Sequence, residues 1–193
     1  TYFGIDISGG LGNTIDYNNL SLYSNKGIRI ENSFNNIISN NLLNGNLSAH
    51  GVSILSGGNN VIFSNTLIKN SFGIYATGAA FGNRIFNNNF INNTNSAFAG
   101  GNNVWNTTNS GNYWSTIASI CLDNNDDGIC DIPYFISTNN ADYFPHVCRD
   151  GWQGNHKPII TTTPISNNAY QGVQYVYDID ASEIDNDTIT YSF

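Results

Sequence analysis

The chain has 193 residues, a formal net charge of −8 and a sequence pI near 4.4. Its 6 Lys and Arg residues form no basic stripe that could meet phosphates, which argues against a nucleic-acid partner. No run approaches about 18 consecutive apolar residues, so the sequence predicts no membrane-spanning helix. The length is enough for one repeat domain and a small second module.

Two markers recur through the first half of the chain at steps of 22 to 25 residues. One is a Gly followed by a β-branched residue, at Gly4-Ile5, Gly27-Ile28, Gly51-Val52 and Gly73-Ile74. The other is Asn-x-Ile-x-x-Asn-x-Leu/Phe, which we place at Asn13 to Leu20, Asn35 to Leu42, Asn60 to Leu67 and Asn83 to Phe90. Two markers with one period indicate a repeat architecture, in which each unit stacks on the one before it.

Residue types indicate which solenoid forms. A leucine-rich repeat needs Leu at most inward sites and usually a helix, whereas β-branched residues and Asn dominate here. Runs such as Gly27 to Ile30 alternate apolar and polar residues, so Ile28 and Ile30 are predicted to face inward. Asn suits the bends because it tolerates the left-handed backbone region, and stacked Asn side chains can form ladders between coils about 4.8 Å apart. The predicted fold class is an all-β parallel β-helix.

The alignment predicts which side chains share a column. One inward column would contain Ile15, Ile37, Ile62, Ile85 and Trp105, with Asn13, Asn35, Asn60 and Asn83 at the bends. A second inward column would contain Leu20, Leu42, Leu67 and Phe90. An outward column reads Asp6, Arg29, Ser53 and Tyr75, and we expect Asp6 and Arg29 to form an ion pair between coils.

After Trp105 the repeat fades, and the following segment is expected to cap the last coil. A β-helix must cover its end because open strand edges and a bare apolar surface invite association. The aromatic side chains expected to close this end are Trp114, Tyr134, Tyr143 and Phe144.

Within the cap lies an acidic loop with the spacing of a cation site. The candidate calcium ligands, at alternate positions of the loop, are Asp123, Asn125, Asp127, Ile129 (through its carbonyl) and Asp131. Hard cations take six to eight oxygens, and Gly128 stands at the sharp turn. A solvated acidic turn is the alternative. Cys121 and Cys130 bracket the loop, so a disulfide between them would pre-form it, and Cys148 would then bridge outside that pair.

The closing motifs also carry a family resemblance. The coils, followed by Gly111 to Ser115, the acidic loop, Ile132 to Tyr134 and Asp142 to Pro145, resemble the NosD-type parallel β-helix repeat family over roughly residues 1–148. Similar modules occur in surface proteins of methanogenic archaea. The resemblance implies a right-handed β-helix at the cell surface or in the periplasm. Cys121 and Cys130 stand where family members usually have small residues, which implies that the two pair with each other.

From Lys157 the chain resembles the opening of a cadherin-like or immunoglobulin-like surface repeat, with about three of its roughly seven strands. The resemblance implies a second, weaker calcium site at Asp180, Glu183, Asp185 and Asp187. The expected domains are coils at 1–116, the cap with the acidic loop at 117–149, a linker at 150–157 and an incomplete β-sandwich at 158–193. We expect longer sequence or a neighbouring subunit to complete both ends of the chain.

The expected function is that of a non-enzymatic extracellular structural or adhesive surface protein. Its expected partners are copies of itself or other surface proteins, and glycans are a further possibility. The alternative is a carbohydrate-binding or carbohydrate-active protein, since β-helices host lyases and glycosidases. Catalysis would need paired carboxylates, and the acids within the coils are only Asp6, Asp16 and Glu31.

Two further features bear on function. Sequons that make glycosylation candidates occur at Asn19, Asn46, Asn92, Asn106 and Asn186. Copper delivery, suggested by the family name, is rejected because copper(I) prefers Met, Cys and His, and the chain has no Met. The three histidines, far apart in sequence, are His50, His146 and His156.

Overall fold

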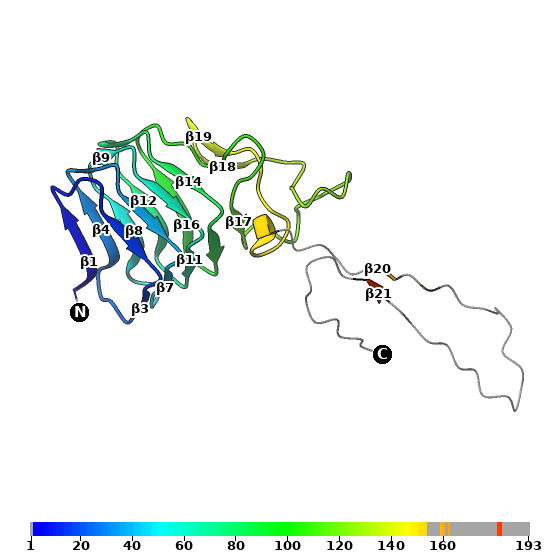
Figure 1. The fold of residues 1–193 in the computed structure, drawn as a ribbon, viewed down its shortest axis with the longest axis horizontal. Helices are drawn as coiled ribbons and strands as arrows, with labels where there is room; N and C mark the ends of the chain where they lie inside the picture. Colours follow the sequence, from blue (N-terminus) through cyan, green and yellow to red (C-terminus); the bar gives the residue numbers. More distant parts are fainter. Residues whose placement is uncertain (1, 154–158, 161, 163–180, 183–193) are drawn as a thin grey trace, which may run out of the picture. The chain divides into compact units, whose positions relative to one another are not determined.

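The computed structural model describes residues 2–153, 159–160, 162 and 181–182. The chain divides into two compact units, Thr1–Trp152 and Gln153–Phe193. The first is an all-β parallel solenoid of five coils (Figure 1). Among the described residues the one helical element is the short 3-10 helix η1 (Gly151–Gln153), and no helix is long and apolar enough to cross a membrane.

Four parallel sheets form the sides of the solenoid, which we name A to D. Side A contains β1 (Phe3–Ser8), β4 (Lys26–Glu31), β8 (His50–Ile54), β12 (Phe72–Ala76) and β16 (Asn95–Ala99). Side B contains β5 (Ser33–Phe34), β9 (Gly57–Gly58) and β13 (Ala80–Phe81). Side C contains β2 (Thr14–Asp16), β6 (Ile37–Ser39), β10 (Val61–Phe63) and β14 (Arg84–Phe86). Side D contains β3 (Asn19–Ser21), β7 (Leu42–Asn44), β11 (Thr66–Ile68), β15 (Asn89–Ile91) and β17 (Tyr113–Trp114).

Sides C and D are built from five-residue units whose positions have fixed roles. In the third coil, Asn59 bends the chain with a φ of 57°, Asn60 points inward and Ile62 enters the core. The next unit begins five residues later at Ser64, with a φ of 54°. Asn reaches this left-handed region more cheaply than most residues, so an Asn-rich sequence can bend at short regular intervals.

Two ladders of inward Asn side chains run along the solenoid. The first contains Asn13, Asn36, Asn60, Asn83 and Asn103, and the second contains Asn18, Asn41, Asn65, Asn88 and Asn112. At each step the backbone N–H and the side-chain Nδ2 of one Asn donate to Oδ1 of the Asn one coil later, over 2.8–3.1 Å. The ladders therefore satisfy buried amides, and every step points in the same direction.

The first core column confirms the sequence prediction in every coil except the second. The strand residues in register are Ile15, Ile38, Ile62 and Ile85. Ile38 is fully buried, whereas Ile37 is 40% exposed, so the prediction for Ile37 was wrong. The second coil carries the doublets Asn35-Asn36 and Ile37-Ile38, which fit the motif in two phases. Asn35 takes the predicted bend with a φ of 55°, and this places Ile38 inside. Asn13, Asn60 and Asn83 were also predicted at bends, but they are inward ladder residues, so that prediction was wrong.

The second core column shows the same one-residue shift. Its members are Leu20, Leu43, Leu67, Phe90 and Trp114. Leu43 is fully buried and Leu42 only half-buried, so the prediction of Leu42 as the core residue was wrong. Trp105 is fully buried, as predicted.

Side A confirms the prediction from the Gly marker. Ile5, Ile28, Val52 and Ile74 align in register, and the outward neighbours Asp6, Arg29, Ser53 and Tyr75 align beside them. The ion pair between Arg29 Nη1 and Asp6 Oδ1 is also present, at 2.9 Å. Because both columns extend over four coils, the register of this side follows from the sequence alone.

Beyond the coils, β18 (Tyr134–Ser137) and β19 (Asn140–Asp142) form an antiparallel hairpin. Trp114 stacks on Phe90 with ring centroids 4.1 Å apart, and Tyr134 stacks on Trp114 at the same separation. Phe144 is half-buried. Tyr143 is 61% exposed, so the prediction that it helps to close this end was wrong.

In the second unit, β20 (Ile159–Ile160) pairs antiparallel with β21 (Ala181–Ser182). Most of the predicted sandwich module at 158–193 lies outside the described residues. So do His156, the sequon at Asn186 and the second calcium ligand set of Asp180, Glu183, Asp185 and Asp187.

Candidate functional site at the end of the solenoid

Both Asn ladders end on β19. Asn140 Oδ1 accepts hydrogen bonds from Asn103 N at 3.0 Å and from Trp105 Nε1 at 3.1 Å. Asn140 Nδ2 donates back to Gly101 O at 3.0 Å and to Ser137 Oγ at 2.9 Å. The side-chain donors of Asn140 are thus used on this molecule, and the ladder stops there.

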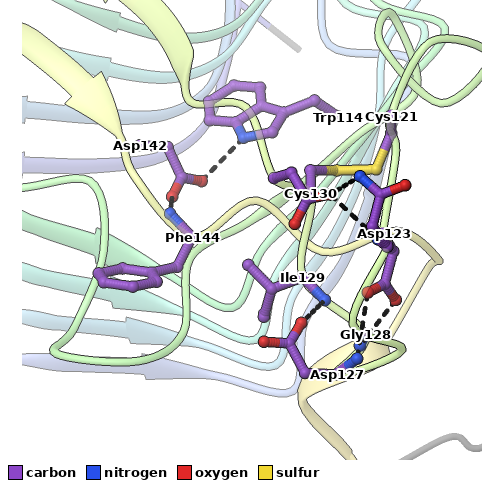
Figure 2. Close-up of a disulfide and its surroundings, with 11 residues drawn as sticks. Trp114, Cys121, Asp123, Asp127, Gly128, Ile129, Cys130, Asp142 and Phe144 are labelled. Atoms are coloured by element: carbon purple, nitrogen blue, oxygen red, sulfur yellow. Dashed lines mark hydrogen bonds between the residues drawn. A yellow bond between two sulfur atoms is a disulfide. The ribbon is translucent and has the colours of Figure 1, made fainter.

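The second ladder ends on a carboxylate, Asp142, where the earlier positions have Asn. Oδ2 accepts from Asn112 N at 2.7 Å, Asn112 Nδ2 at 3.2 Å and Trp114 Nε1 at 2.8 Å. Oδ1 accepts from Phe144 N at 3.1 Å (Figure 2). Burial raises the pKa of Asp142 from 3.8 to about 6, and these hydrogen bonds partly oppose the rise. The ladder therefore terminates in a buried acid that titrates near neutral pH.

A disulfide joins Cys121 to Cys130 and confirms the predicted pair, which does not include Cys148 (Figure 2). Between them the loop folds on its own backbone. Asp123 accepts from Asp127 N at 3.1 Å and from Gly128 N at 2.9 Å. Gly128 makes the turn with a φ of 80°, a conformation that suits Gly.

The other predicted calcium ligands also make contacts within the loop. Asp127 Oδ1 accepts from Ile129 N at 2.9 Å, and its Oδ2 accepts from Asn125 Nδ2 at 2.9 Å. Asp131 Oδ2 accepts from Asn124 N at 3.0 Å. In the described part of the chain no group of three or more His, Cys, Asp and Glu side chains is placed to hold a metal ion. Calcium binding stays a prediction, and an ion would have to draw these carboxylates away from the amides.

His146 connects the loop to the solenoid, a role that no sequence pattern indicated. Its backbone N donates to Asn112 O at 2.9 Å, and its Nε2 lies 2.8 Å from Ser110 Oγ. Beside it, Val147 N donates to Gly128 O at 3.1 Å. Burial lowers the pKa of His146 below its usual 6.5, and a contact with the Gly128 backbone opposes this effect. The backbone of His146 and Val147 thus links the loop to the last coil, and the His146 ring adds a contact with Ser110.

The acids of the coils all bind neighbouring side chains. Arg29 contacts Asp6 at 2.9 Å and also contacts Glu31, a pairing that the sequence analysis missed. Asp16 accepts from Ser39 Oγ at 2.8 Å. Asp6 and Glu31 thus share one guanidinium.

The sequons differ in their accessibility. The exposed ones in the described part are Asn19, Asn46 and Asn92. Asn106 is half-buried, and its Nδ2 donates to Thr107 O at 2.6 Å while its Oδ1 accepts from Tyr143 N at 3.2 Å. A glycan on Asn106 would replace one hydrogen of this Nδ2, so it would have to fit beside these contacts.

The fold and these contacts define a parallel β-solenoid protein with a disulfide-bracketed loop beside its last coil. The family model for NosD, described as a periplasmic copper-binding protein, matches residues 1–119. The match spans more than half of the chain, so this protein belongs to the NosD family. No curated protein and no solved structure gives a significant match to the chain.

The family description implies copper, but the donors in this chain do not fit that metal. Copper(I) prefers Met, Cys and His, and the sequence contains no Met. The His50 ring lies 5.3 Å from Phe72 and 4.8 Å from Tyr75, whereas His146 bonds to Ser110. In the described residues these donors are not gathered in one place, and two of the three Cys are joined in a disulfide. We assign no copper-dependent step.

Proposed function

We propose that this protein is a non-enzymatic structural scaffold of the periplasm or cell surface, with the β-helix as a rigid spacer. The proposal is supported by the partners of the polar side chains, which are other groups of the solenoid. Asp6 binds Arg29, Asp16 binds Ser39, and the buried amides bind the next coil. General acid–base catalysis needs a carboxylate held for the substrate. In this solenoid the carboxylates instead support the stacking of coils.

In this proposal residues 117–149 are the cap of the scaffold. Asn140 and Asp142 take the ladder donors, and Tyr134 covers Trp114. A covered end cannot template the addition of another strand, so the cap would keep this end from associating. Calcium in the acidic loop would hold the cap more firmly, since the ion would link residues across the loop.

The proposed location outside the cytoplasm has two supports. The disulfide between Cys121 and Cys130 is of a kind that persists in oxidising compartments and is rare in the cytosol. The matching family is described as periplasmic. Fractionation of source cells, with a protease applied to intact cells, tests this location. Recovery of the protein from the cytoplasm alone would refute it.

The absence of enzymatic activity is tested by incubating the purified chain with neutral and acidic polysaccharides and measuring new reducing ends. We expect none above the rate of a heat-unfolded sample. Turnover that disappears in Asp6→Asn or Glu31→Gln would overturn the scaffold proposal, because it would show that the carboxylates at Arg29 act on a substrate.

Carbohydrate binding is a second candidate, favoured by an aromatic cluster on the outward face of side A. Tyr75 stacks on Phe98 with ring centroids 5.0 Å apart, and the His50 ring lies tilted against Tyr75 at 4.8 Å. Phe98 is 40% exposed. Burial, followed by the charge of Lys26, lowers the pKa of His50, which favours the uncharged imidazole. Such a surface suits a neutral sugar ring. Calorimetry with neutral hexasaccharides tests it: Phe98→Ala should abolish binding that Phe86→Ala leaves intact.

A further inference from the structure

The outward face of side C has a composition that points to a partner. Side chains next to the buried Ile column face outward because side chains alternate along a strand. From the first coil to the fourth they are Thr14 and Asp16, Ile37 and Ser39, Val61 and Phe63, and Arg84 and Phe86. Ser39 is only 3% exposed, because it lies under Asp16 and donates a hydrogen bond to it. The face thus has one acid at its first coil, one base at its fourth coil, and small or apolar side chains between them.

This face exposes apolar surface on a chain of net charge −8. Ile37 is 40% exposed, and Phe63 stacks on Phe86 with centroids 5.7 Å apart. The guanidinium of Arg84 lies 5.5 Å from the Phe86 ring. Around the adjoining bend, on side B, Phe81 is 52% exposed. Exposed apolar side chains gathered on one face are candidates for a weak protein–protein contact.

We propose that side C docks against side C of a second copy of this chain, with the two solenoid axes antiparallel. A two-fold axis along the strand direction places the first coil of one copy against the fourth coil of the other. Arg84 then lies opposite Thr14 and beside Asp16 of the second copy, and the symmetry makes this contact twice. The inference rests on the proposed structural role, for which it names the contact surface.

The sizes of the central side chains also match in this arrangement. Ile37 faces Val61 of the second copy, and the large Phe63 lies over the position of the small, buried Ser39. If the two solenoid axes ran parallel, each coil would face the same coil of the second copy. Asp16 would then face Thr14 and remain three coils from Arg84. In the described residues Arg84 takes part in no ion pair. Charge complementarity therefore favours the antiparallel pair.

The area of the face determines how tightly two copies are expected to bind. Four strands about 4.8 Å apart, with three residues of about 3.3 Å each, project roughly 150–200 Å². A stable interface buries about 800 Å² per partner, so one such contact is weak, with a Kd on the order of 0.1 mM. Repeated contacts within an array would add to its effective strength.

Sedimentation equilibrium of the full chain, from about 10 µM to about 1 mM, tests the proposal. We expect a monomer–dimer equilibrium that Arg84→Asp or Asp16→Arg weakens at least about tenfold, and that the combined charge swap restores. Arg149→Asp is the matched control, since it makes the same charge reversal at a side chain that is 56% exposed and pairs with Asp150. It should leave dimerisation unchanged.

Three outcomes would overturn the inference. The chain could be a monomer at every concentration, Arg84→Asp and Asp16→Arg could both leave the dimerisation constant unchanged, or the combined charge swap could fail to restore association. Circular dichroism checks that each variant is folded, and Asp16→Asn replaces Asp16→Arg if the latter is not. Dimerisation that the side C variants do not weaken would refute this contact but not the scaffold proposal. Polysaccharide turnover or a cytoplasmic location would instead refute the scaffold and leave the contact intact.

Discussion

Replacing Asp142 by Asn tests how the second ladder ends. The folded-state pKa of about 6 lies above the ordinary value of 3.8, so the native protein binds the proton more tightly than the unfolded chain. Its stabilising contribution is therefore fully present below pH 3.8 and is lost as the pH rises through about 6. A difference of about two pKa units corresponds to about 3 kcal/mol, as an order of magnitude.

The Asp142→Asn variant keeps an oxygen for Asn112 and Trp114 but loses the titratable proton. Its free energy of unfolding relative to the wild type should therefore change by about 3 kcal/mol between pH 4 and pH 7, in favour of the variant at the higher pH. Urea titrations at several pH values, followed by the fluorescence of the buried Trp105 and Trp114, measure this difference.

A companion variant at the other ladder end provides the reciprocal experiment. Asn140→Asp would place a buried carboxylate beside the carbonyl of Gly101, which now accepts a hydrogen bond from Asn140 Nδ2 at 3.0 Å. This variant should lose stability as the pH rises. If the difference between Asp142→Asn and wild type stayed constant within about 0.5 kcal/mol from pH 4 to pH 7, the coupling of ladder and carboxylate would be refuted.

Three further predictions concern the core, the disulfide and the loop. Ile38→Ala should lower the free energy of unfolding by about 2–5 kcal/mol and Ile37→Ala by less than about 0.5 kcal/mol, and equal losses in urea titrations would contradict the register. Cys121→Ala should cost about 2–3 kcal/mol through the lost loop constraint, and an unchanged urea midpoint would argue against that role. Calcium at about 1 mM should raise the melting temperature of the wild type but not of Asp127→Asn, and calorimetry that finds no shift in the wild type would remove the site.

The sequence was sufficient for the solenoid class and for side A, because two independent markers share one period. It was insufficient in the second coil, where Asn35-Asn36 and Ile37-Ile38 satisfy the motif in either phase. Local pattern cannot separate these phases, since both give the same alternation of residue types. The choice is made by pairing with the neighbouring coils, where Ile38 lies beside Ile15 and Ile62.

The end of the solenoid was harder to predict for a different reason. Asp142 lies 30 residues beyond Asn112, after a segment with no period, so no repeat pattern connects the two. The composition also did not separate the two uses of Asn. Asn59 bends the chain with a φ of 57°, whereas the neighbouring Asn60 is a ladder residue. Only the inward or outward direction of each side chain distinguishes them.

The one-way hydrogen bonding of the ladders has a consequence for how such a protein changes in evolution. Most steps span 23 or 24 residues, and the closing strand accepts the ladder hydrogen bonds from the last coil. A gene duplication that adds one whole coil would leave each junction with the same donors and acceptors. The length of the solenoid can therefore change by about 4.8 Å for each coil that is duplicated or deleted, while the contacts that close its end stay the same.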